Sequence, residues 1–405
     1  MKGRRGICLA FMCAIMAWTC PNAQAVDPET GRVRILYIGD GWGPSPVPFL
    51  RSDPGFDLVS VPTSTLHADV SSIGFSTGVM RKLVRLYMPR SLAEMLAKHD
   101  LTILSDANPF FIAEKYLTWI RDSTVDNGLG LVMVGGMESF GAPKGMPWTS
   151  LEDMLPVDIG LDITQGYYFP SFKVQPARDH RFTRSLPWRS MPFFHGMNRL
   201  TLKEGATLLL EAEGHPYPPL SYWEFGEGVS VAHAPDWTPV SGGDVMRWEF
   251  YLDYVANIAY LATGSRIPEN PYLIHSLRTG FWSMRVRLTS VVDIAGFVEK
   301  FGANSYNLER KLAESRDLVA SAERLYVLQE YEAARRRIAE IEMQIKELQG
   351  QAMDLKDRAL LWVYVVEWSV TLGIGILAGV ALWALMVRRN LYTAVGVTRL
   401  RRGEE

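Results

Sequence analysis

Apolar residues are grouped in two different ways along this chain, and the change falls near residue 266. Before it, short β-branched runs at residues 33–38, 101–104 and 130–134 alternate with segments of helical spacing. This alternation predicts a parallel sheet with helices on both faces. Beyond residue 266, long runs rich in Ala, Leu, Glu, Arg and Lys predict helices. We therefore expect an α/β domain followed by a helical stalk.

The apolar patterns near the two ends predict a secreted, membrane-anchored chain. A basic start, an apolar run over residues 7–18 and the tripeptide Ala23-Gln24-Ala25 have the layout of a secretory signal peptide. An uncleaved anchor is the alternative, but the run is short for a membrane span. Residues 368–387 carry no charge and are long enough to cross a bilayer as one helix. Arginines follow them, and arginine excess marks the cytoplasmic side.

These patterns divide the chain into five parts. They are a signal peptide (1–25), an extracytoplasmic domain (26–265), a helical stalk or hairpin (266–358), a transmembrane helix (359–387) and a basic cytoplasmic tail (388–405). We expect a single-pass protein of the cell membrane, with its large domain in the periplasm or at the cell exterior.

The stalk contains a short coiled-coil-like seam. Its apolar residues have the 3-4-3 spacing of a heptad pattern and are Ile338, Ile341, Ile345 and Leu348. We expect this seam to pack within a hairpin of the same chain, and pairing between two copies is the alternative. The stalk and the span together predict a membrane-protein partner or a homo-oligomer.

Composition excludes several functions. The formal net charge is −2, which gives no reason to expect a nucleic-acid partner. The three cysteines all lie within the predicted signal peptide, at Cys8, Cys13 and Cys20, so the mature chain has no thiol and no disulfide. No two of the seven histidines have the i, i+4 spacing of a helical zinc site. We therefore expect no metal and no cofactor.

Polar and small residues follow the predicted strands. Ligands of parallel sheets bind at the carboxyl ends of strands, and the candidates there are Asp40, Asp106, Gly135, Gly136 and Glu138. Asp236, which follows a later predicted strand, could converge with them on a polar ligand or cation. The alternative for each carboxylate is an ordinary role in capping a helix or ordering a loop.

Three segments carry a resemblance to a known family. They are Ser105-Asp106 with the run GLVMVGGMESFGAPKGMPWTSLEDMLPVDI, the run PPLSYWEFGEGVSVAHAPDW, and a predicted helix from Val245 to Ala262. Over residues 33–264 the chain resembles the glutamine amidotransferase-like family, relatives of the class I amidotransferases. The resemblance implies a flavodoxin-like sheet. It also implies a Cys-His-Glu site, but the turn at Gly136-Met137-Glu138 has no cysteine, so we expect a pseudoenzyme without glutaminase activity.

Three functional hypotheses remain open. The leading one is a membrane-anchored, extracytoplasmic binding or scaffold protein built on a non-catalytic amidotransferase-like domain. The second is a hydrolase that uses Ser139, His233 and Asp236 at the strand ends. The third is a purely structural envelope protein. Residues 164–203, rich in aromatic residues, Pro and Arg, have no periodicity and predict an irregular lid or insertion that either binds a partner or packs on the domain.

Overall fold

The computed structural model describes residues 27, 30–40, 44–63, 77–108, 111–140, 149–159, 166–268, 270–301 and 304–400. The predicted signal peptide, with its three cysteines, lies outside the described residues. The chain divides into two compact units, residues 1–278 and 279–405.

The first unit is built on a mixed sheet, which has eight strands among the described residues, in the order β2-β1-β3-β4-β12-β11-β10-β7. Pairing is parallel from β2 to β12 and antiparallel from there to β7. The strands are β1 (Val33–Gly39), β2 (Phe56–Pro62), β3 (Leu101–Ser105), β4 (Gly130–Val134), β7 (Val174–Pro176), β10 (Thr207–Ala212), β11 (Leu220–Phe225) and β12 (Gly228–His233).

The prediction of a wholly parallel sheet is therefore correct for one half and wrong for the other. Only Gly226 and Glu227 separate β11 from β12, and Gly226 has a φ of 67°. A two-residue connection makes a hairpin, whereas a parallel pair needs a crossover of a dozen residues or more. The short turn forces β11 to run against β12.

Helices cover both faces of the sheet. In the sheet, β2 lies on one side of β1, and β3 and β4 lie on the other side. Crossovers between parallel strands are right-handed, so the two directions of crossing place α1 on one face of the sheet and α4 and α5 on the opposite face. The contacts agree, because α9 packs on α1 while α4 packs on α5. The helices are α1 (Val47–Ser52), α3 (Thr77–Tyr87), α4 (Leu92–Lys98), α5 (Glu114–Val125), α6 (Thr149–Glu152), α7 (Arg181–Arg184), the 3-10 helix η3 (Trp188–Ser190), α8 (Pro239–Met246) and α9 (Tyr251–Ala262).

The aromatic-rich segment predicted to be irregular folds mainly as short pieces beside the main sheet. β5 (Val157–Ile159) pairs with β9 (Leu200–Leu202), and β6 (Tyr167–Tyr168) pairs with β8 (Met197–Asn198). Phe172, Phe182 and Phe194 are almost fully buried and join the main core. Much of this segment therefore packs on the domain.

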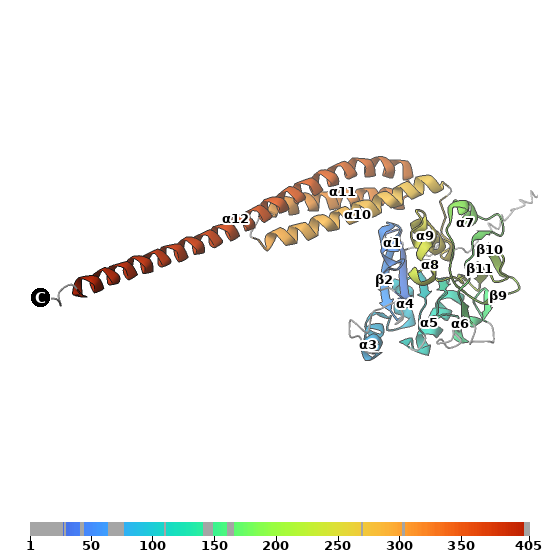
Figure 1. Ribbon diagram of the computed structural model, residues 1–405. Helices are drawn as coiled ribbons and strands as arrows, with labels where there is room; N and C mark the ends of the chain where they lie inside the picture. The colour runs from blue at the N-terminus through green and yellow to red at the C-terminus, as the bar shows by residue number, and fades with distance from the viewer. Residues whose placement is uncertain are drawn as a thin grey trace, which may run out of the picture. The chain divides into compact units, whose positions relative to one another are not determined.

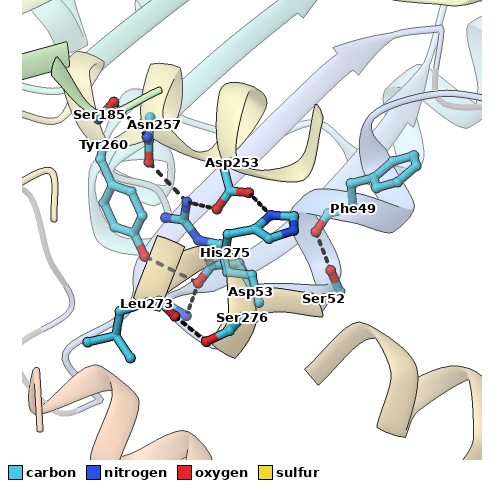
Figure 2. Close-up of polar contacts among 12 residues, drawn as sticks. Phe49, Ser52, Asp53, Ser185, Asp253, Asn257, Tyr260, Leu273, His275 and Ser276 are labelled. Carbon is cyan, nitrogen blue, oxygen red and sulfur yellow. Dashed lines mark hydrogen bonds and ion pairs between the residues drawn. The ribbon is translucent and has the colours of Figure 1, made fainter. Parts of the chain in front are cut away.

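A buried ion-pair network lies within the first unit, which includes the first turns of α10 (Pro271–Glu299). Arg278 is fully buried; its Nε donates to Asp53 Oδ2 (2.7 Å) and its Nη1 donates to Asp253 Oδ1 (2.9 Å) and Asn257 Oδ1 (3.0 Å). Figure 2 shows Asp253 between Asn257 and His275, whose Nδ1 lies 2.7 Å from the second oxygen of Asp253. The network joins α10 to α9 and to the end of α1.

The second unit is helical. Figure 1 shows α10, α11 (Tyr306–Val327) and α12 (Tyr331–Leu400) running alongside one another. The predicted heptad-like seam is almost fully buried inside the chain. Its last residue, Leu348, joins a core that all three helices supply: Val291 and Ala295 from α10, Leu308 and Leu312 from α11, and Leu348 and Ala352 from α12.

α12 continues without a break from the packed helices into the apolar segment, as Figure 1 shows. Among the described residues it is the one helix long and apolar enough to cross a membrane, and none of its most apolar stretch is buried within the chain. Its large apolar side chains there, such as Leu372, Ile376 and Leu382, are more than 60% exposed.

Candidate functional site

Polar side chains gather where β1, β3, β4 and β12 end. β1 pairs with β2 on one side and β3 on the other, so the strand order reverses at β1. In α/β sheets, ligands bind beside the carboxyl ends of the strands at such a point. Asp40 follows β1 directly and is 3% exposed. Its Oδ1 accepts hydrogen bonds from Ser105 Oγ (2.7 Å) and from the Tyr37 hydroxyl (3.1 Å).

Asp106 follows β3 in an unusual backbone conformation. Its φ of 41° lies in the left-handed region, which Asp tolerates better than most residues. Its Oδ1 accepts a hydrogen bond of 2.6 Å from the backbone N–H of Glu138, which ties the end of β3 to the turn after β4. Strained backbone of this kind is concentrated at binding and catalytic sites.

The two predicted glycines allow this turn to approach its neighbours. A Cβ at Gly136, whose φ is 154°, would lie 2.2 Å from the carboxyl carbon of Asp106. A Cβ at Gly135 would lie 1.9 Å from the carbonyl oxygen of Ala234. Gly135 and Gly136 therefore contribute to the site because the absence of a side chain lets the turn approach Ala234 and Asp106 closely.

Glu138 and Asp236 complete the cluster of acids. Both are almost fully buried, at 2% and 1% exposure. Glu138 Oε1 accepts a hydrogen bond from Asn108 Nδ2 (2.8 Å). Asp236 accepts two from Thr238, one from the backbone N–H (2.8 Å) and one from the hydroxyl (2.7 Å).

The electrostatics of the cluster favour positive or hydrogen-donating ligands. Burial, and after it the charge of Asp236, raises the pKa of Asp40 well above the usual range, and the same two causes raise the pKa of Asp106. No Lys or Arg of the described residues forms an ion pair with either carboxyl group. No group of three or more His, Cys, Asp or Glu side chains in the described part of the chain is placed to hold a metal ion.

The structure does not link Ser139, His233 and Asp236 by hydrogen bonds. His233 is fully buried; its Nδ1 lies 2.7 Å from the Pro235 carbonyl oxygen and its Nε2 lies 2.6 Å from the Tyr254 hydroxyl. Burial lowers the pKa of His233 to about 4, so the ring is neutral at pH 7. Ser139 Oγ is buried and has no hydrogen-bond partner among the described residues.

Two residues of the site were missed from the sequence. Asn198 donates to the carbonyl oxygens of Gly136 and Ser139 (both 3.2 Å) and accepts from the Gly136 N–H (2.9 Å), so it fixes the turn after β4. Trp237 Nε1 donates to Ser105 Oγ (2.8 Å) and thereby supports Asp40. The position of Trp237, directly after Asp236 at the end of a predicted strand, could have indicated a role in the site. Nothing in the sequence near Asn198 indicates such a role.

Comparisons with known proteins give one family match in this region and several distant structural neighbours. Residues 88–263 match a family model described as "Putative glutamine amidotransferase". Two solved structures of cytoplasmic proteins from Salmonella typhimurium, one of them from strain LT2, are each 21% identical. Both cover 57% of this chain and 99% of their own, with TM-scores of 0.46 for the LT2 protein and 0.45 for the other. A beta-galactosidase from Bacillus circulans sp. alkalophilus is 13% identical over 59% of this chain and 32% of its own, with a TM-score of 0.33.

No curated protein matches the chain. A glutamine amidotransferase-like domain spans residues 88–263, and it contains Asp106, Glu138 and Asp236. Asp40 follows β1 and lies before the matched segment.

Proposed function

We propose that this protein binds a small polar ligand at the strand-end site of an amidotransferase-like domain and does not carry out thiol chemistry there. The ligand class is a molecule that donates hydrogen bonds through amine or hydroxyl groups. We further propose that α12 anchors the protein in a membrane, with the binding domain outside the cytoplasm.

The observation that carries the proposal is the condition of Asp40. This side chain is buried, and its Oδ2 has no hydrogen-bond partner among the described residues. A buried carboxylate oxygen without a partner costs free energy, and such groups are uncommon in native proteins. A ligand N–H or O–H at this position would remove that cost.

The absence of a thiol supports binding over glutamine hydrolysis. The sequence has no cysteine after Cys20, and the turn after β4 carries Met137 and Glu138 where an amidotransferase would present its nucleophile. Neither side chain can replace a thiolate in attack on an amide.

The membrane anchor is supported by the exposed apolar part of α12. In water this surface would be unfavourable, whereas a bilayer matches it. The arginines that follow the apolar segment support a cytoplasmic location for the C-terminal end.

Thermal unfolding of the full chain in lipid nanodiscs tests the binding proposal, with L-glutamine, putrescine and glucose as probes. The test variant is Asp106→Asn, since Asn also tolerates the left-handed conformation. The matched control is Glu204→Gln, which removes an exposed carboxylate. We expect one probe to raise the Tm of the wild type and of the control, with a much smaller rise in Asp106→Asn.

The proposal is wrong if none of the three probes shifts the Tm, or if Asp106→Asn responds like the wild type. A parallel assay with glutamine should release no glutamate above the level of a protein-free blank. Glutamate release by the wild type that Asp106→Asn abolishes would replace the binding function with a thiol-independent hydrolysis.

A further inference from the structure

A hydroxyl, an imidazole and a carboxylate form a hydrogen-bonded chain outside the buried acid cluster. Ser171 Oγ lies 2.9 Å from His195 Nδ1, and His195 Nε2 lies 2.9 Å from Asp244 Oδ2. The three residues come from separate segments, 24 and 49 positions apart. This is the order of groups that activates a serine nucleophile, with a base between the hydroxyl and an orienting acid.

The backbone holds two of these groups in place. Ser171 and His195 are adjacent to Phe172 and Phe194, which pair through two backbone hydrogen bonds of 3.0 Å and are almost fully buried. The N–H of His195 donates to the carbonyl oxygen of Ser241 (2.8 Å), one turn before Asp244 in α8. The spacing of the three side chains therefore follows from buried pairing beneath them.

The backbone next to His195 packs against Tyr167, which interacts with Asp236 of the strand-end site. Tyr167 and Ser241 share a hydrogen bond of 2.5 Å between their hydroxyl groups, and a Cβ at Gly196 would lie 2.6 Å from both oxygens. Burial, and after it the charge of Asp236, raises the pKa of the Tyr167 hydroxyl. Tyr167 is thus close both to Asp236 and to Gly196, the residue after His195.

Solvent can reach these groups. Ser171 is exposed, and the side chains of His195 and Asp244 are 42% and 50% exposed. Two exposed aromatic rings, Phe169 and Phe193, stand two positions before Ser171 and His195 in the sequence. Such rings offer contact to an apolar acyl group.

We propose that Ser171, His195 and Asp244 form an acyl-transfer site for esters of small apolar acids, separate from the predicted Ser139–His233–Asp236 set. Ser171 is the nucleophile, His195 the general base and Asp244 the positioning residue. The hydroxyl of Ser171 and the imidazole of His195 are exposed to solvent. In the strand-end set, by contrast, His233 is fully buried and both of its ring nitrogens have hydrogen-bond partners.

The reaction balances without a cofactor. Ser171 Oγ forms a bond to the ester carbonyl carbon while its proton passes to His195 Nδ1. The bond from that carbon to the alcohol oxygen then breaks, and the alcohol leaves with the proton from Nδ1. Water attacks the acyl-serine with the same base and releases the acid. Asp244 accepts the Nε2–H throughout and stabilises the imidazolium.

The test uses the full chain in nanodiscs with p-nitrophenyl butyrate as substrate and a fluorophosphonate as covalent probe. The fluorophosphonate should label Ser171, identified by peptide mass spectrometry. Ser171→Ala should remove the label and lower the hydrolysis rate at least about tenfold, and His195→Gln should lower the rate similarly, since general-base catalysis contributes about 10²-fold or more. Ser276→Ala, which removes an exposed serine of α10, is the matched control and should leave label and rate unchanged.

Asp244 is tested by the pH profile. Asp244→Asn should lower the hydrolysis rate and shift the pH–rate profile toward lower pH, because the imidazolium loses its stabilising carboxylate. Asp244→Glu should restore both the rate and the profile. Melting curves by circular dichroism confirm that each variant folds. A label on any other residue, or wild-type hydrolysis by Ser171→Ala, would overturn the proposal.

Discussion

At the scale of single residues, the strand-end site combines several strained or costly features. Asp106, which follows β3, and Phe140, in the turn after β4, both have a positive φ, at 41° and 46°. Asp40 and Asp106 are buried acids that Asp236 repels. A sequence selected for stability alone would replace such residues, so these features favour a binding role.

Replacing Asp40 with Asn should stabilise the free protein at neutral pH. Folding raises the pKa of Asp40, so its stabilising contribution is fully present below the unfolded pKa of about 4 and is lost as the pH rises through the folded pKa. Asn cannot ionise, and its side-chain oxygen can still accept from Ser105 and Tyr37. Thermal unfolding should show a Tm rise of about 2–4 °C at pH 8, the size of about 1 kcal/mol in a domain of this length.

The Tm values of Asp40→Asn and of the wild type should also be compared at a low pH. His233 affects stability there in the opposite direction to Asp40, because its pKa is lowered by folding. Its folded pKa of about 4 lies below the unfolded value, so its contribution is present above about pH 6.5 and is lost as the pH falls toward 4. This loss is the same in Asp40→Asn and in the wild type. The difference in Tm between the two proteins should therefore shrink toward zero at pH 4, and a difference that stays constant with pH would contradict the prediction.

At the scale of elements, α9 connects the candidate site to the first turns of α10. Tyr251 donates to the Trp237 carbonyl oxygen (2.8 Å), and Tyr254 lies against His233. On another side of α9, Asp253 and Asn257 accept from Arg278. One short buried helix therefore contacts both the strand-end turn and the ion-pair network.

Replacing Arg278 with Met should destabilise the first unit strongly. The change leaves the Asp53 and Asp253 carboxylates buried without their cation, and breaking a buried pair in this way costs about 3–5 kcal/mol. Urea unfolding monitored by tryptophan fluorescence measures the loss. Arg184→Gln is the control, because that side chain is 71% exposed and the loss of its ion pair with Asp179 should cost less than about 1 kcal/mol.

A triple variant, Arg278→Met with Asp53→Asn and Asp253→Asn, separates charge from packing. It should recover much of the lost stability, because the uncompensated charges are gone. Equal stability of Arg278→Met and the wild type would mean that the network contributes little to holding α10.

At the scale of the whole molecule, the chain joins a polar-site domain to a long helix with an exposed apolar end. The amidotransferase-like segment occupies residues 88–263, and α12 extends to Leu400. Under the proposed function, the candidate ligand site and the proposed membrane segment belong to one polypeptide. The orientation across the membrane remains a prediction from the arginines after the span.

Cysteine labelling in intact cells measures that orientation. If the signal peptide is removed, the mature chain contains no thiol, so the wild type should not react with a maleimide. Asp158→Cys, at a side chain 61% exposed, should react with a membrane-impermeant maleimide in intact cells. Tyr392→Cys, beyond the apolar segment, should react only after the cells are permeabilised. The opposite pattern would place the domain in the cytoplasm.

Local patterns were sufficient to predict the parallel strands β1, β3 and β4 and the acidic residues that follow them. β1, β3 and β4 coincide closely with the apolar runs, and Asp40, Asp106 and Glu138 meet at their carboxyl ends. These results follow from the sequence because side-chain periodicity sets which face of an element is buried, and parallel strands end at a common edge. The antiparallel half was not foreseen, although the turn at Gly226 carried a usable signal.

Contacts between distant segments could not be read from the sequence. Arg278 and Asp53 are 225 positions apart, Asn198 and Gly136 are 62 apart, and Ser171, His195 and Asp244 come from three segments without a shared motif. Each pairing depends on how the helices and strands between the two residues are arranged in space. Local propensity carries no information on that arrangement; packing of the sheet against its helices sets it, and the sequence encodes it only through the sum of many weak contacts.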